Sequence, residues 1–140
     1  MQQDSISATF LILNELLASR LSKRIGNHLG VHGLSLAEYL IMHHLNSSPV
    51  KAMPRIELAE YIGMSASGIT RLLAPMEKNK IVEKEANPRD ARQSLVKLSK
   101  TGQRLFKEAS TTFDHVADSL VGKLSQNQLE KCIELYGKLM

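Results

Sequence analysis

The segment from Pro54 to Ala74, PRIELAEYIGMSASGITRLLA, predicts two short helices joined by a tight turn. Its apolar residues recur at steps of three and four on either side of Gly63, as in helices that bury one face. Gly63 suits the end of the first helix, because glycine adopts a positive φ without strain. Ser65 can cap the second helix by accepting a hydrogen bond from a free backbone N–H. This pattern is typical of a helix-turn-helix.

The second of these helices has a short polar face that fits the major groove of DNA. Ser67, Thr70 and Arg71 lie opposite the apolar Ile69 and Leu73 at helical spacing. A helix that presents one arginine among small polar side chains can read base edges. The alternative is an αα-hairpin in an ordinary helical bundle, and the small residues at the predicted turn favour DNA binding over it.

A short hairpin is predicted directly after the helix-turn-helix. Pro75 should bend the second helix, because it has no N–H to donate to the carbonyl of Arg71. Polar and apolar residues alternate over 81–86, as in a strand, and this strand is too polar to lie at the centre of a sheet. Turn residues fill 87–91, and 95–98 returns as a second strand. We expect a wing of about five residues a side with a charged tip.

Long helices are predicted at both ends of the chain. Asp4 to Leu29 carries an apolar stripe that is too wide for one neighbour, and Gly26, Gly30 and Gly33 should end this helix. Further helix starts are predicted from capping residues, namely Ser35 with Glu38 in a capping box, Ser99 and Ser125. In the helix over 34–45 the residues expected to face inward are Leu36, Leu40, Ile41 and Leu45.

The two chain ends also predict self-association. The stripes of Asp4 to Leu29 and Ser99 to Met140 carry more large apolar residues than one small winged helix can cover. Exposed apolar surfaces of that size mark interfaces. We therefore expect an obligate homodimer built from the terminal helices.

Length, composition and charge exclude several classes of protein. At 140 residues the chain is long enough for one domain with its own core. Only 4% of residues are aromatic and none is tryptophan, which argues against a stacking platform for single-stranded nucleic acid. Lys51 to Lys107 holds twelve Lys or Arg against six Asp or Glu, so positive charge is concentrated around the helix-turn-helix. The single cysteine and the absence of an apolar leader or membrane span favour the cytoplasm, with no membrane partner.

Three short motifs together resemble the MarR family of bacterial transcriptional regulators. They are Ser67-Gly68-Ile69-Thr70-Arg71-Leu72 in the second helix, Pro88-Arg89-Asp90-Ala91-Arg92 in the wing, and Leu98-Ser99-Lys100-Thr101-Gly102 at the start of the following helix. The resemblance implies a mainly α fold with a small β-hairpin, a winged helix-turn-helix with long N- and C-terminal dimerisation helices. This chain departs from the family at Lys80, where glycine is usual, and at Lys84, where arginine is common.

The resemblance also implies roles for individual residues. Ser67, Thr70 and Arg71 would face the major groove, while Arg92 would approach the minor groove or its phosphates. Asp90 would hold the arginine through an ion pair. The candidate DNA-binding residues are Ser65, Ser67, Thr70, Arg71, Arg89, Asp90 and Arg92.

These interpretations give one domain over 1–140, with a DNA-binding lobe at 34–99 and dimerisation helices at 4–29 and 100–140. The expected function is a repressor that binds a near-palindromic operator in double-stranded DNA as a homodimer. The resemblance implies release by a small aromatic or anionic effector. The crevice that binds this effector would be lined by the segment from Ile6 to Leu17, by residues around His43 and by the helix from Lys100.

Other functions remain as alternatives. A winged helix used for protein contact would bury apolar groups on its second helix, which Ser67, Thr70 and Arg71 argue against. A zinc-sensing regulator would need ligands that His28 and His32 do not supply at a recognisable spacing, and a redox sensor would have to rely on Cys132. We expect no metal, no cofactor and no enzyme activity, because no nucleophile, base and orienting group recur at interpretable spacing.

Overall fold

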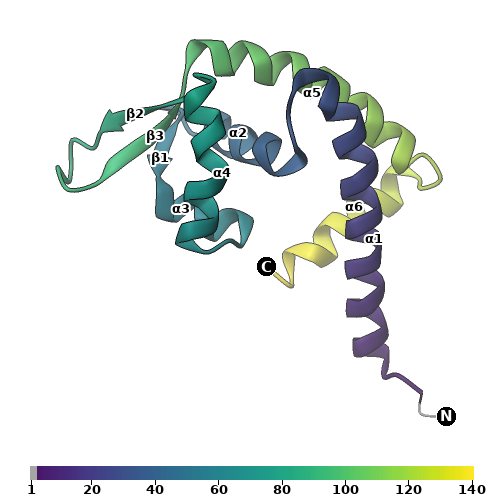
Figure 1. Cartoon of the computed structure of the whole chain (residues 1–140). Helices are drawn as coiled ribbons and strands as arrows, with labels where there is room; N and C mark the ends of the chain where they lie inside the picture. Colours follow the sequence, from purple (N-terminus) through teal and green to yellow (C-terminus); the bar gives the residue numbers. More distant parts are fainter. Residues whose placement is uncertain (1–2) are drawn as a thin grey trace.

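The computed structural model describes residues 3–140, and it is mainly helical with one small sheet. In chain order the elements are α1 (Ile6–Leu29), a short 3-10 helix η1 (Gly30–His32), α2 (Leu36–Ser47), β1 (Ala52–Pro54), α3 (Arg55–Ile62), α4 (Ala66–Lys78), β2 (Val82–Ala86), β3 (Ser94–Leu98), α5 (Lys100–Leu120) and α6 (Gln126–Gly137) (Figure 1). This confirms the predicted fold class, including the helix-turn-helix, the hairpin and the long terminal helices.

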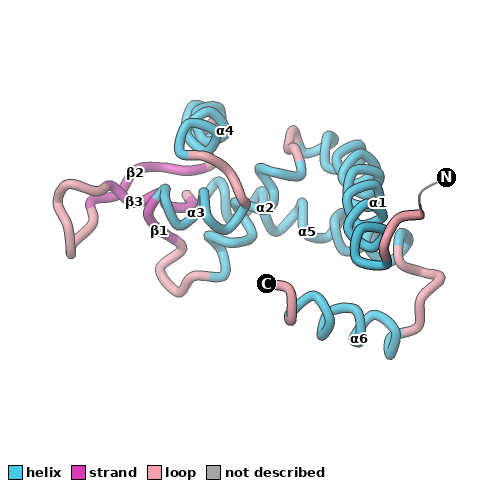
Figure 2. The backbone as a smooth tube through the Cα atoms, turned by 90° about the horizontal axis from the view of Figure 1, so that it is seen from below, coloured by secondary structure: helices cyan, strands magenta, loops and turns pink. Residues whose placement is uncertain are grey.

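The elements form two parts that α5 connects. The central lobe, α2 to β3, carries the β2–β3 hairpin at one end of the molecule, and α1 and α6 lie at the other end (Figures 1 and 2). In both views α5 runs from the base of the hairpin toward α1, against which it packs. The arrangement separates the helix-turn-helix from the terminal helices.

Within residues 3–140, serine side chains cap five of the six α-helices. The Oγ atoms of Ser5, Ser35, Ser65, Ser99 and Ser125 each accept a hydrogen bond from the backbone N–H three residues later. The capping box of Ser35 and Glu38 is present, and Ser125 forms another with Gln128. Each cap satisfies a backbone donor that the helix itself leaves free. The four predicted caps are confirmed, and Ser5 explains why α1 begins at Ile6 rather than Asp4.

The sheet has three antiparallel strands in the order β1-β3-β2. The central strand is β3, which pairs Lys97 with Ala52 on one side and Leu98 with Val82 on the other. The polar β2 lies at the edge, as its sequence predicts. The sequence did not reveal β1, because three residues that include Pro54 have no strand period of their own. Pro54 ends this strand and is the N-cap of α3, one position before the first helical turn.

The core lies between α2, α3, α4 and the sheet. Leu58, Leu73 and Met76 are fully buried in it, beside the small Ala59. On α2 the buried residues are Tyr39, Ile41, Met42 and Leu45. Leu36 and Leu40, which were also expected to face inward, are only half-buried. Near the end of α1, Gly26 does not terminate the helix, which ends at Leu29 before Gly33 turns the chain with a φ of 71°.

The terminal helices leave most of their apolar residues exposed in the single chain. On α1 only Leu29 is buried, while Ile6 is 90% and Phe10 48% exposed. On α6 no residue is buried. Within residues 3–140, no helix is long and apolar enough to cross a membrane.

Candidate nucleic-acid interface

The turn between α3 and α4 is built on Gly63. This glycine has a φ of 73° and lies where the backbone leaves α3. The N–H of Met64 donates to the carbonyl of Ala59 at 2.9 Å, and the N–H of Gly63 donates to that of Glu60 at 3.3 Å. Both bonds satisfy carbonyls at the helix end, in the pattern of a left-handed glycine cap. The predicted positive φ is therefore confirmed.

Helix α4 has one buried face and one polar face. Ile69, Leu73 and Met76 are buried in the core, whereas Thr70 and Arg71 are exposed. At the helix start the Ser65 Oγ accepts from the N–H of Gly68 at 3.1 Å and lies 3.2 Å from the Ser67 Oγ. The helix continues through Pro75 to Lys78. Its N-terminal turns thus present small polar side chains and one guanidinium to the solvent.

An ion pair that the sequence did not reveal joins the two helices. The Arg55 Nη2 at the start of α3 lies 2.6 Å from the Glu77 Oε1 in the last turn of α4, and both side chains are about 30% exposed. The two residues are 22 positions apart, so no local spacing connects them. Because the pair is partly solvated, its main effect is to set the direction of the two side chains.

The wing tip is ordered by side chains that accept from the backbone. The Asn87 Oδ1 accepts from the N–H of Arg89, and the Asp90 Oδ1 accepts from the N–H of Arg92, each at 3.0 Å. Such bonds over two residues are typical of Asx turns. The ion pairs found within residues 3–140 do not include Asp90 with Arg92, so the prediction of an ion pair between these two residues is wrong. Asp90 positions the backbone of Arg92 and leaves its guanidinium exposed.

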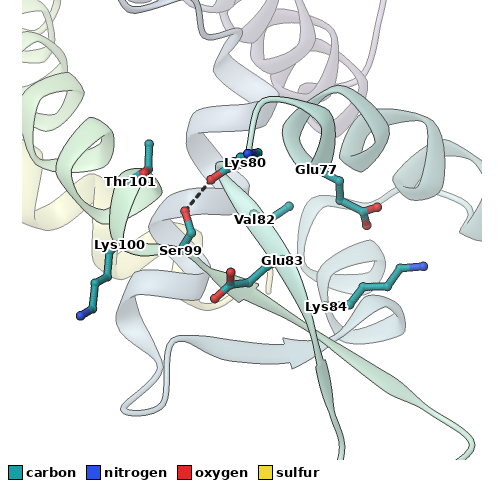
Figure 3. A pocket seen from close by; sticks show the side chains of 8 residues that line it. All are labelled: Glu77, Lys80, Val82, Glu83, Lys84, Ser99, Lys100 and Thr101. Carbon is teal, nitrogen blue, oxygen red and sulfur yellow. Dashed lines mark hydrogen bonds between the residues drawn. The ribbon is translucent and has the colours of Figure 1, made fainter.

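The base of the wing is attached to the end of α4 and the start of α5. Lys80 adopts a φ of 60°, which explains why glycine is usual in the family at this position. The Ser99 hydroxyl lies 2.6 Å from the Lys80 carbonyl oxygen and 2.9 Å from that of Ile81 (Figure 3). Ser99 therefore caps α5 and also holds the junction from which β2 leaves α4.

The residues considered for metal or redox sensing lie elsewhere. Within residues 3–140, no group of three or more His, Cys, Asp or Glu could hold a metal ion. The His32 Nε2 lies 2.7 Å from the Thr112 Oγ1, which links η1 to α5. Cys132 is exposed and lines a small apolar pocket between α6 and Phe10 of α1.

The seven candidate residues fall into two groups within the central lobe. Ser65, Ser67, Thr70 and Arg71 share the exposed start of α4. Arg89, Asp90 and Arg92 share the wing tip, and all seven are exposed. Helix, turn, recognition helix and paired strands in this order define a winged helix-turn-helix protein.

Comparison with known proteins supports the resemblance to the MarR family. A model described as MarR family matches residues 32–93, which span α2 to the wing. The match agrees with the resemblance to this family that the three motifs predict. It is 22% identical over 131 residues to the HTH-type transcriptional regulator MhqR of Bacillus subtilis, covering 90% of this chain and 85% of that protein.

Solved structures have the same fold over nearly the whole chain. A MarR family transcriptional regulator from Streptomyces coelicolor in complex with DNA has a TM-score of 0.85 and 20% identity, covering 99% of this chain and 89% of that one. A mutant MarR from E. coli complexed with operator DNA has a TM-score of 0.81 and 17% identity, covering 98% of this chain and 99% of that one. Both likenesses include the terminal helices.

Proposed function

We propose that this protein is a transcriptional regulator that binds double-stranded DNA as a homodimer and acts as a repressor. The observation that carries the proposal is the exposed polar start of α4 in the same lobe as the two exposed wing arginines. One element can enter a major groove, while the other reaches an adjacent minor groove or its phosphates. Because it acts on DNA, we propose that the protein works in the cytoplasm. We assign it no enzyme activity.

The seven candidate residues divide into base-reading and phosphate-contacting roles in this proposal. Thr70 and Arg71 lie one turn inside α4, close enough to its start to contact base edges. Ser67 faces the same major groove, and Ser65 stands at the helix start, where a hydroxyl can donate to phosphate. Arg92, with Arg89 and Asp90 beside it, contacts the minor groove or its phosphates.

A protein-interaction module is the competing class for a winged helix. Such a module uses an apolar helix face, because apolar and aromatic groups dominate the centre of protein interfaces. The exposed positions of α4 instead include Ser67, Thr70, Arg71 and Lys78. Steep salt dependence of binding and competition by unlabelled duplex distinguish DNA recognition from protein recognition.

The second copy of the chain covers the terminal helices in this proposal. Within one chain, Phe10 of α1 and Leu139 after α6 remain 48% and 65% exposed. The same face includes the apolar pocket of Phe10, Cys132 and Tyr136. We assign residues 34–99 to the DNA-binding lobe and 4–29 with 100–140 to dimerisation. Sedimentation that finds a folded monomer at micromolar concentration contradicts this assignment.

Release from DNA by a small aromatic or anionic effector is the regulatory part of the proposal. The expected crevice combined Ile6 to Leu17 with His43 and the helix from Lys100. In the single chain Phe10 lines a pocket with α6, whereas His43 lies with its ring 6.1 Å from that of Phe106 on α5. An effector must bind the DNA-incompetent spacing more tightly to release the operator.

The test begins by selecting the preferred site from a random duplex pool. We expect a near-palindrome with half-sites about 10 base pairs apart. Substitution of Thr70 should change the preferred sequence, and Arg71→Ala should cost about 1 to 3 kcal/mol on the selected duplex. Arg92→Ala should weaken all duplexes alike. It should also lower the slope of log affinity against log salt by about one for each phosphate that the arginine neutralises in the wild type.

The matched control is Lys123→Ala, which removes one exposed positive charge between α5 and α6. It should leave both the preferred sequence and the salt slope unchanged. The assignment of roles is wrong if Arg71→Ala weakens every duplex equally, or if Arg92→Ala behaves as the control does.

A further inference from the structure

A cationic pocket lies between the end of α2 and the first half of α5, away from the residues that we assign to DNA. We call it the α2–α5 pocket. Its volume is about 530 Å³, and its wall includes Asn46, Lys51, Lys100, Arg104, Phe106 and Lys107. Of the eight residues that line it, four are positively charged and none is acidic. The volume falls within the roughly 300–1,000 Å³ typical of small-molecule sites.

The charges of this pocket are not neutralised by neighbouring carboxylates. Lys100, Arg104 and Lys107 follow one another at steps of four and three, so they share one face of α5. Repulsion between like charges at this spacing destabilises the free helix, and a bound anion would offset it. The ion pairs found within residues 3–140 are Arg55 with Glu77, Lys97 with Glu85 and Lys131 with Glu134.

Lys51 is held in place on the opposite wall. Its Nζ donates to the backbone oxygen of Asn46 at 3.1 Å and to the Oδ1 of the same residue at 3.0 Å. Its φ of 56° is unusual for a residue with a side chain, and its carbonyl accepts from the N–H of Leu98. The ammonium group is therefore oriented by neutral oxygens rather than by a carboxylate.

Phe106 lines the pocket and belongs to a stack of aromatic rings behind it. Phe106 is buried, and its ring centroid lies 5.3 Å from that of Tyr39. Tyr39 also stacks on Phe113 at 4.6 Å, and its hydroxyl lies 3.1 Å from the Ser110 Oγ. This packing holds the part of α5 that carries the cations against α2.

The neighbouring pocket at the wing base does not have these properties. It is lined by Lys80, Lys84 and Lys100, but also by Glu77 and Glu83. Figure 3 shows Lys84 and Lys100 pointing in different directions, with Glu83 between them. Mixed charges that do not converge give no selectivity for an anion, so this pocket suits an anion less well than the α2–α5 pocket does.

We propose that the α2–α5 pocket binds a small molecule that carries a phosphate or pyrophosphate group. Lysine ammonium groups and a planar guanidinium suit phosphate oxygens, and several cations favour a multiply charged ligand. DNA is a less suitable occupant because α5 starts at the far end of α4 from Ser65, about 20 Å along a 13-residue helix. The inference does not depend on the proposed DNA site.

The test uses calorimetric titration of the full chain with sodium pyrophosphate at constant ionic strength. Wild type should bind about one pyrophosphate per chain, and Lys51→Gln with Arg104→Gln should weaken binding about tenfold or more. The control, Lys23→Gln with Lys123→Gln, removes the same charge elsewhere and should bind as wild type does. If the Lys51 change lowers the melting temperature, Lys100→Gln with Lys107→Gln takes its place, because both side chains are exposed.

Two outcomes overturn the proposal. One is the absence of saturable pyrophosphate binding by wild type, or equal binding by the pocket and control variants. The other is weaker binding of an unrelated DNA duplex, with a lower salt slope, in the pocket variant alone, which would make these cations part of the DNA interface. Failure of the DNA proposal leaves the pyrophosphate result unaffected, so the two are separable.

Discussion

Gly102 is the residue at which a single methyl group should be least tolerated. It is buried in the first turn of α5, where an added Cβ would overlap the carbonyl oxygen of Ile81 and lie 2.7 Å from the Leu98 Cδ1. The Ile81 oxygen cannot move freely, because it accepts from the N–H of Ser99 at 3.0 Å and from its hydroxyl at 2.9 Å. The substitution Gly102→Ala therefore forces α5 away from the base of the wing.

The expected loss follows from two opposing effects. Overpacking against backbone costs about 3 kcal/mol, the upper end of the usual range. Alanine regains about 1 kcal/mol over glycine through its higher helix propensity. The net loss in the free energy of unfolding is about 2 kcal/mol, or roughly 6 °C in melting temperature for a chain of this size.

Urea unfolding followed by circular dichroism, at one protein concentration, measures this loss. Gly26→Ala is the matched control, because Gly26 lies inside α1 and its added Cβ would meet nothing within 4 Å. It should raise the free energy of unfolding by about 0.5 to 1 kcal/mol. The reasoning fails if Gly102→Ala is as stable as wild type, or if Gly26→Ala loses as much as Gly102→Ala.

Three further substitutions test other features of the structure. Lys80→Gly relieves the φ of 60° and should raise the free energy of unfolding by up to about 1 kcal/mol, seen as a higher urea midpoint, whereas an unchanged midpoint would mean the lysine is unstrained. Ser65→Ala removes the cap of α4 and should cost about 1 kcal/mol in the same assay, with weaker DNA binding. Burial raises the pKa of Tyr39, and the hydrogen bond with Ser110 partly opposes this rise. The Tyr39 hydroxyl therefore ionises at a lower pH in the unfolded chain than in the folded one. Its contribution to stability is complete below about pH 10 and declines above it; Tyr39→Phe should cost about 1 kcal/mol near neutral pH and show less alkaline loss in urea curves.

Features set by nearby residues could be predicted from the sequence, and features set by distant contacts could not. The caps Ser35, Ser65, Ser99 and Ser125 act on an N–H three residues away, so their spacing is visible in the chain. β1 exists only because β3 pairs with it, some 40 residues later. The Arg55–Glu77 ion pair and the stack of His44 on Tyr61, at 3.7 Å, likewise need the folded chain.

The candidate site was predictable in its positions but not in its local bonding. Thr70 and Arg71 are exposed because Ile69 and Leu73 occupy the buried face, which helical periodicity determines. On the wing, periodicity gives no information about a turn. Whether Asp90 pairs with the guanidinium or the N–H of Arg92 depends on the tip backbone, and the structure has the N–H bond.

The junction at Ser99 and Gly102 connects the proposed dimer helices to the proposed DNA-reading helix. Ser99 bonds both carbonyls where α4 gives way to β2, and Gly102 allows α5 to contact the Ile81 oxygen. A rotation of α5 must therefore move α4 with it. Over its 21 residues α5 is about 32 Å long, so a rotation of about 5° at its far end moves α4 by about 3 Å. Since one base pair also spans about 3.4 Å along DNA, small changes in angle between the two protomers are enough to take the recognition helices out of register with their half-sites.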